Sequence, residues 1–184
     1  MNQTAMEVAA TVSLILSESL DGVVCYHAFE AYRQARNEVE VEMKKRYPGV
    51  KAASGAYRTA LIFDDFIIKF SRDEYRQEAI LTEAEFINDF RADEKYARHF
   101  PETYVVQVGV APVLVQQKVD MSHRGFSWDD HREVEYLGDR LGIEDVHQGN
   151  YGWAGPKGKR YPVFVDVDLR QSGARRKPRR SWHV

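Results

Sequence analysis

The sequence predicts a single α+β domain, and three observations lead to that prediction. Apolar residues recur at helical spacing in several segments, whereas they alternate with polar ones in others. At 184 residues with 43% hydrophobic content, the chain can bury one sizeable core. Its 29% charged and 12% aromatic residues lie in the range of globular proteins.

The first two predicted elements are helices, which we interpret as scaffold. Residues 7–20 carry apolar side chains at helical spacing, and residues 28–46 are rich in helix-forming residues. The second helix is expected to end before Pro48-Gly49, a strong helix-breaking pair.

A β-hairpin is predicted next. Between residues 50 and 70 apolar and polar side chains alternate, and the turn-forming pair Asp64-Asp65 precedes the apolar run 66–70. Helical spacing returns over residues 73–90.

Two strand-like runs, 104–110 and 112–119, follow that helix, so the order is strand, strand, helix, strand, strand. In the remaining chain, Ser127 is a plausible N-cap for a helix over residues 128–141. A Gly-rich polar loop then leads to a short apolar strand at 161–167. Three aromatic residues near the loop are interpreted as core or loop packing: Trp128, Tyr151 and Trp153.

The charge distribution is asymmetric. The last fifteen residues contain 6 of the 26 Lys and Arg residues and none of the 28 Asp and Glu residues. The tail 170–184 has no core-forming pattern and is expected to be disordered, with binding of nucleic acid as the competing hypothesis.

The protein is expected to be cytoplasmic and to have no membrane partner. Cys25 is the only cysteine, so the chain cannot form an internal disulfide or a Cys-based zinc site. The N-terminal apolar run lacks a basic leader and is interrupted by Glu7, Ser17 and Glu18, which argues against a signal peptide or membrane span.

The densest polar chemistry lies in two short segments. Residues 143–150 read IEDVHQGN, and residues 163–168 read VFVDVD. Carboxylate and carboxamide oxygens suit Mg²⁺, and this spacing allows Asn150 and Asp166 to approach one ion. Asp145 would then be available to orient a hydroxyl group.

These segments resemble the protein-kinase-like superfamily, including short phage and bacterial kinase-like proteins and aminoglycoside or choline phosphotransferases. Asp145, His147 and Asn150 match the D-x-H-x-x-N catalytic loop of that family. The resemblance implies that Asp145 orients the attacking hydroxyl and that Asn150 and Asp166 bind metal, with Asp168 as an alternative ligand. His147 is expected to be a hydrogen-bonding residue within the loop rather than the base.

The resemblance also implies a lysine on a strand that pairs with a glutamate on the following helix. Lys69 in FIIKF is similar to that lysine. Glu83, fourteen residues later, is the predicted partner, and Glu78 and Glu85 are the other candidates.

Two further family features are expected to bind the nucleotide. Ser54-Gly55 stands where the glycine-rich phosphate loop would lie, in a degenerate form. The stretch containing Gln116, Gln117 and Lys118 resembles the hinge between lobes, whose backbone would contact adenine.

The fold implied by the resemblance has two lobes. We expect a helical extension over residues 1–48, an N-lobe over 49–120 with a small antiparallel sheet and a C-type helix, and an abbreviated helical C-lobe over 121–169. The basic tail completes the chain.

The function implied is transfer of the γ-phosphoryl group of ATP, with Mg²⁺, to a hydroxyl, and a serine/threonine kinase is one form of it. The chain continues for only some sixteen residues beyond Asp168, which leaves no conventional platform for a peptide substrate. That favours the alternative of a kinase-like binding protein, or pseudokinase, acting on a host or partner protein.

Overall fold

The computed structural model contains helices and an antiparallel five-stranded sheet, so the α+β class is confirmed. It describes residues 2–23, 28–55, 58–73, 77–123, 125–143, 145–156 and 158–167. The elements form two compact units: unit 1 comprises residues 1–92 and 101–118, and unit 2 comprises residues 93–100 and 119–184. Asp168 and the basic tail lie outside the described residues.

Unit 1 is built on the five-stranded sheet, in the order β1-β2-β3-β5-β4 with every neighbouring pair antiparallel. The turn between β2 and β3 is the predicted one at Asp64-Asp65, closed by a hydrogen bond from Phe63 N to Phe66 O of 2.9 Å. The strands are β1 (Lys51–Ser54), β2 (Arg58–Ile62), β3 (Phe66–Ser71), β4 (Thr103–Val108) and β5 (Ala111–Gln117).

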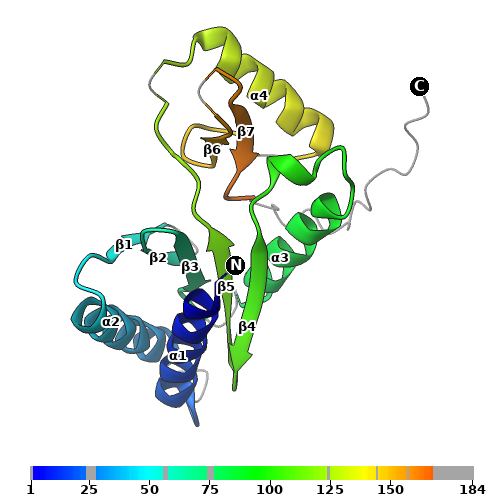
Figure 1. Cartoon of the computed structure of the whole chain (residues 1–184). Coiled ribbons are helices and arrows are strands. Elements are labelled where there is room, and N and C mark those ends of the chain that lie inside the picture. Colours follow the sequence, from blue (N-terminus) through cyan, green and yellow to red (C-terminus); the bar gives the residue numbers. More distant parts are fainter. Residues whose placement is uncertain are drawn as a thin grey trace. The chain divides into compact units, whose positions relative to one another are not determined.

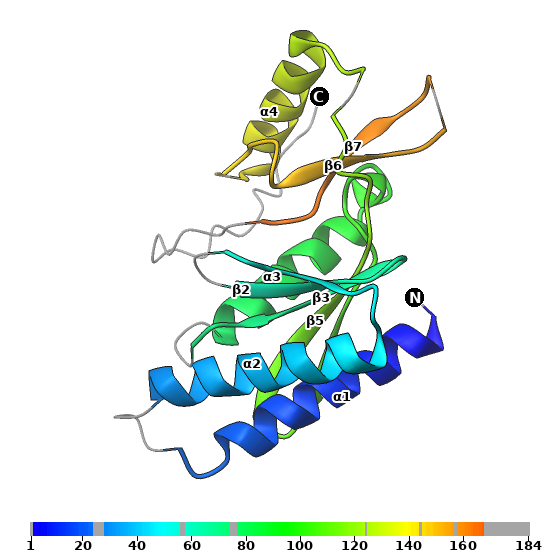
Figure 2. The same cartoon turned by 90° about the vertical axis from the view of Figure 1, so that its left-hand side faces the viewer.

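Helices cover both faces of this sheet (Figures 1 and 2). The helices α1 (Gln3–Leu20) and α2 (Ala28–Arg46) lie side by side on one face, where they form the main hydrophobic core with the sheet. The helix α3 (Gln77–Arg91) packs on the other face, through a cluster of Ile80, Ala84 and Leu114.

Two serines attach α1 to the turn between β4 and β5. Ser13 Oγ donates to Ala111 O at 2.6 Å and accepts from Val108 N at 2.7 Å. Ser17 Oγ donates to Val108 O and accepts from Val110 N and Ala111 N. Helix α1 is therefore an integral part of the sheet unit.

Some elements differ from the predictions where their residues are polar or exposed and so show no apolar pattern. Helix α1 begins at Gln3 rather than near residue 7, because the Asn2 side chain caps it by accepting from Ala5 N at 2.9 Å. Strand β1 was not predicted separately, since it is an exposed edge strand with little apolar alternation.

Unit 2 contains the helix α4, a two-stranded sheet and a short 3₁₀ helix. Its elements are η3 (Ala97–His99), α4 (Trp128–Leu141), β6 (Tyr151–Ala154) and β7 (Tyr161–Phe164). Helix α4 has the predicted bounds and the predicted cap at Ser127, which forms a reciprocal capping box with Asp130. The segment 93–100 packs on β7, where Phe100 contacts Phe164 and His99 Nδ1 lies 2.8 Å from Pro162 O.

Strand β6 was not predicted, although two of the aromatic residues interpreted as packing lie in it. Tyr151 and Trp153 are both buried there. Gly152 between them permits a close approach, because a Cβ at this position would lie 2.6 Å from Asp120 O.

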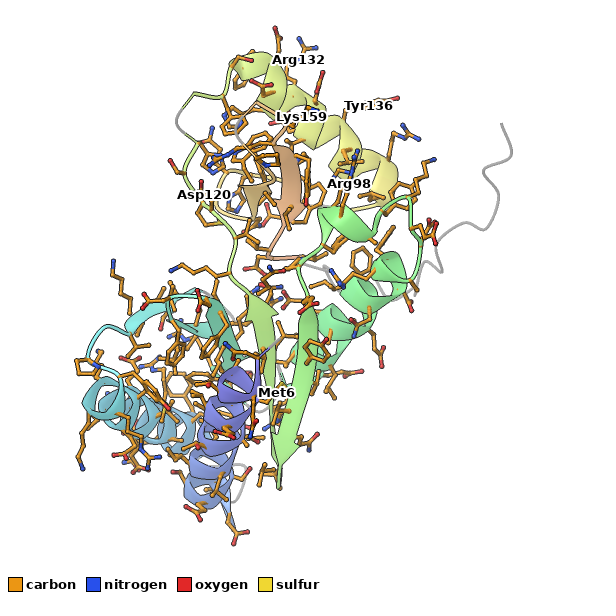
Figure 3. The ribbon with its side chains drawn as sticks, viewed as in Figure 1. Met6, Arg98, Asp120, Arg132, Tyr136 and Lys159 are labelled. Atoms are coloured by element: carbon orange, nitrogen blue, oxygen red, sulfur yellow. The ribbon has the colours of Figure 1, made fainter. Side chains whose placement is uncertain are left out.

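Helix α4 presents one face to the interior of unit 2 and the other to solvent. Val134, Gly138 and Leu141 are buried, whereas Tyr136 is 66% exposed. Tyr136 and Arg132 project away from the two-stranded sheet (Figure 3).

Within the described ranges, no helix has the length and apolar character needed to cross a membrane.

Candidate functional site

The most distinctive polar feature of unit 1 is a buried charge cluster on the α3 face of the sheet. Lys69 Nζ on β3 donates to Glu83 Oε1 on α3 at 3.0 Å. Arg58 Nη1, at the start of β2, donates to the other carboxylate oxygen, Glu83 Oε2, at 2.5 Å. The side chains are 8%, 1% and 11% exposed for Lys69, Glu83 and Arg58, so two cations share one buried carboxylate.

Local sequence explains why Glu83 is the partner of Lys69. Ile80, Glu83, Ala84 and Ile87 form the buried stripe of α3, with the three- and four-residue spacing of one helical face. Lys69 pairs with Leu114 across the sheet, and Leu114 packs on that stripe. The pairing expected from the sequence is present.

The alternative partners are excluded by their exposure. Glu78 and Glu85 both lie on the solvent side of α3. Arg58 was not anticipated, because a single arginine at the start of a strand carries no signal that distinguishes it from an exposed edge charge.

The turn between β1 and β2 contains the predicted phosphate-loop residues. Gly55 N donates to Arg58 O at 2.9 Å, and Gly55 O accepts from Arg72 Nη1 at 2.6 Å. The hydroxyl of Ser54 lies 3.2 Å from that of Thr59. The Gly55 amide is thus engaged within the hairpin, so phosphate binding by this group would require the hairpin bond to open.

The predicted hinge residues lie at the end of β5. Gln117 N donates to Glu102 O at 2.8 Å, and Lys118 N donates to Asp65 O at 3.1 Å. Lys118 Nζ also donates to Phe63 O at 2.9 Å. These two backbone N–H groups therefore already have protein acceptors.

Unit 2 contains the D-x-H-x-x-N segment as a compact loop before β6. Asn150 Nδ2 donates to Asp145 O at 2.9 Å, and Asn150 N donates to His147 O at 2.8 Å. Asn150 O accepts from Val165 N at 2.9 Å and from Asp166 N at 3.2 Å. Asn150 therefore links Asp145 to Asp166, which are separated by twenty-one positions in the sequence.

His147 is held within the same loop. Its Nδ1 accepts from Gly149 N at 3.0 Å, and its Nε2 lies 3.7 Å from Asp145 Oδ2. Because Nδ1 is an acceptor, the proton of the neutral ring is on Nε2, toward Asp145. This geometry matches the expected hydrogen-bonding role. The Asp145 side chain is 41% exposed and can be reached from solvent.

A hydrogen-bonded network of aromatic side chains contacts the loop before β6 and supports it. Trp153 Nε1 donates to His123 Nδ1 at 3.0 Å, so the His123 proton is on Nε2, which donates to Gln148 O at 2.8 Å. His131 Nδ1 and the Tyr151 hydroxyl share a hydrogen bond of 2.5 Å. Burial raises the pKa of Tyr151 above its ordinary value, and Glu135 adds to the shift, so the hydroxyl keeps its proton.

Helix α4 contacts the loop directly through Gly138. A Cβ on Gly138 would lie 2.3 Å from Val146 Cγ2, so only glycine allows this contact. The sequence gives no sign of this support, because the contact between Gly138 and Val146 forms only when the loop folds back onto the helix.

The loop supplies ligand types that fit Mg²⁺. Asn150 and Asp166, joined by the backbone hydrogen bond, present a carboxamide and a carboxylate, and Mg²⁺ in proteins commonly takes one or two carboxylates with water completing its shell. Within the described part of the chain, no group of three or more His, Cys, Asp or Glu side chains is arranged to hold a metal ion. The alternative ligand Asp168 lies outside that part.

Comparisons with protein-family models, with curated proteins and with solved structures find no match to this chain.

Proposed function

We propose that this protein is a minimal kinase-like phosphotransferase that uses ATP and Mg²⁺ to phosphorylate a hydroxyl group. The observation that carries the proposal is the buried pair between Lys69 on the third strand and Glu83 on the next helix. In protein kinases a lysine of the third strand and a glutamate of the following helix form the ion pair needed for activity.

Each unit contributes a separate part of the chemistry. In unit 1, Lys69 would bind the phosphates while Glu83 fixes the position of its ammonium group. In unit 2, Asp145 would orient the acceptor hydroxyl and accept its proton, and its exposure leaves it accessible to that hydroxyl. The hydrogen bond from Asn150 to Asp145 O holds the loop in the required conformation.

Asn150 and Asp166 would hold Mg²⁺, with Asp168 as a further candidate. The metal supplies positive charge that offsets the charge developing on the phosphate oxygens. The bond from Asp166 N to Asn150 O keeps the backbones of these two residues adjacent.

A second candidate function is nucleotide-dependent or nucleotide-independent binding of a partner protein without catalysis. The observation that favours it is the engagement of Gly55 N, Gln117 N and Lys118 N by protein carbonyls. These N–H groups are the ones expected to contact the nucleotide, and each would have to give up its protein carbonyl to do so. The basic tail as a nucleic-acid tether remains a weaker hypothesis.

The two candidates are separated by comparing the wild type with Asp145→Asn. We expect ATP with Mg²⁺ to raise the melting temperature of both proteins. Only the wild type should transfer labelled phosphate to itself or to an acceptor, and the variant should lose at least a hundredfold in rate, the scale of a general base. The matched control is Asp139→Asn, the same substitution at an exposed position of α4, and it should behave as wild type.

A thermal shift in both proteins without phosphate transfer by either would favour the binding protein. No shift with ATP and Mg²⁺ at millimolar concentration would remove the proposed function.

A further inference from the structure

The five-stranded sheet of unit 1 ends in two edge strands of different character. Strand β1 is short and exposed and begins with Lys51, features that natural sheets use to prevent edge-to-edge association. Strand β4, the other edge (Figure 1), reads TYVVQV, has neither charge nor proline, and pairs with β5 in an unbroken register. Among the residues that the structure describes, no further strand pairs with β4. One edge of the sheet therefore lacks the usual protection.

The register with β5 shows which backbone groups of β4 point away from the sheet. Gln117 N donates to Glu102 O at 2.8 Å, so these two residues form a hydrogen-bonded pair. Hydrogen-bonded and non-hydrogen-bonded pairs alternate along an antiparallel ladder. The even-numbered residues of β4 therefore bond to β5, whereas the N–H and C=O groups of Val105 and Gln107 point outward.

The accessible outward-pointing residues lie symmetrically about Val106. Val105 and Gln107 are both exposed. Thr103 also points outward, but it is only 3% exposed, and at the other end the chain turns at Gly109. A second strand can therefore form its backbone hydrogen bonds with β4 only through Val105 and Gln107.

The side chains on one face of β4 form an apolar row. Tyr104, Val106 and Val108 pair with β5 residues of the main core, so they lie on the face of the sheet that α1 covers. Val106 packs against that core, whereas Tyr104 and Val108 are 43% and 36% exposed. Exposed apolar side chains that lie together mark an interaction surface more often than single ones do.

We propose that β4 pairs antiparallel with β4 of a second copy of this chain, about a two-fold axis at Val106. In this register Val105 of one copy and Gln107 of the other exchange both of their backbone hydrogen bonds. The two-fold axis repeats this exchange, and the sheets of the two copies become continuous.

The side chains explain why the occupant is a second copy. In the same register Tyr104 lies opposite Val108 of the other copy, and Val106 lies opposite Val106, so the apolar row meets the same row in reverse order. Aromatic and β-branched residues form favourable cross-strand pairs, and no like charges face each other. The strand is thus complementary to itself. Tyr104 and Val108 belong to neither the charge cluster nor the polar loop, so the proposal is independent of the proposed function.

The test measures the molar mass of the full chain in solution over a range of concentrations. We expect the wild type to form a dimer, with twice the chain mass of 21.3 kDa. Tyr104→Lys and Val108→Lys each place a charge against the apolar row, and each should raise the dissociation constant of the dimer at least about tenfold.

Two double variants test the register. Tyr104→Lys combined with Val108→Glu places opposite charges across the axis and should recover most of the lost affinity. Tyr104→Lys combined with Val108→Lys places like charges there and should weaken the dimer further. The two positions are about 13 Å apart within one strand, so the recovery can come only from a contact between copies.

Ala53→Lys is the matched control, because it adds the same charge at an exposed position of the other edge strand, and the dimer should be unchanged. Hydrogen exchange gives a second measurement: the amides of Val105 and Gln107 should exchange more slowly as the wild-type concentration rises. If a lysine variant does not fold, Val105→Pro replaces it, because proline removes only an N–H that points outward.

Three outcomes would overturn the proposal. A wild type that stays monomeric up to millimolar concentration would leave this edge to a strand of another protein. A dimer that neither lysine variant weakens would have its interface elsewhere. Variants that dissociate without recovery in the Lys–Glu combination would show that the two copies do not pair in this register.

Discussion

The charge cluster of unit 1 and the polar loop of unit 2 are built in different ways. In unit 1, Arg58, Lys69 and Glu83 are joined side chain to side chain and are nearly inaccessible to water. In unit 2, Asp145 and His147 have side chains that are 41% and 57% exposed, and the loop is held by hydrogen bonds between side-chain and backbone atoms and between pairs of backbone atoms.

Because the two sites differ in burial, we expect mutations in them to have different effects on stability. A buried ion pair whose partner is removed leaves an uncompensated charge in a low-dielectric setting, so the free energy of unfolding falls sharply. An exposed carboxylate held in place by the backbone can be replaced with little effect on stability. Changes in the unit 1 cluster should therefore act on stability and activity together, whereas Asp145 should affect activity alone.

The largest effect is expected for Glu83→Gln. The substitution leaves two buried cations without their shared carboxylate, and we expect a loss of about 3–5 kcal/mol in the free energy of unfolding. Denaturant titration measures it. Lys69→Met is the matched comparison: Glu83 keeps its bond to Arg58, so this variant should lose much less stability. Equal losses of unfolding free energy in the two variants would show that Arg58 alone does not compensate the buried charge of Glu83.

A smaller effect is expected for Asn150→Ala in unit 2. The substitution removes the hydrogen bond to Asp145 O, worth about 1 kcal/mol, and leaves that carbonyl to water. The loop should loosen, so Asp145 becomes more accessible to protease or hydrogen exchange while the sheet of unit 1 keeps its protection. A loss of protection in unit 1 of the same size would contradict the separation of the two regions.

The sequence predicted the parts of the fold that have strong periodic patterns. Helix α2 and helix α4 have the bounds expected from helix formers, Pro48-Gly49 and the Ser127 cap. Strands β1 and β6 were missed, because an exposed edge strand and a four-residue strand containing glycine have little alternation. Periodicity reports burial, so it cannot detect a strand whose residues are largely exposed.

The candidate site shows the same limit. Glu83 was predicted because the kinase-like resemblance implies a glutamate partner for the strand lysine Lys69, and because apolar residues form a stripe beside Glu83 on the helix. Arg58 and the support of the loop by His123 and His131 depend on side chains brought together by tertiary packing. No spacing rule within one segment of sequence reports such contacts.

The smallest effect is expected from pH, and it acts on unit 2. Burial lowers the pKa of His99 below its ordinary value near 6.5; Arg98 adds to the shift, and the hydrogen bond to Pro162 O opposes it. The unfolded chain binds this proton more readily than the folded protein. The contribution of His99 to stability is therefore fully present above about pH 6.5, and it is lost as the pH falls from 6.5 toward the lower native pKa. Denaturant midpoints between pH 7.5 and 5 for His99→Asn, whose amide can still donate to Pro162 O, should decline less steeply than those of the wild type. An identical slope in both proteins would mean that His99 is protonated equally in the folded and unfolded states, and the acid sensitivity of unit 2 would then have to come from other groups.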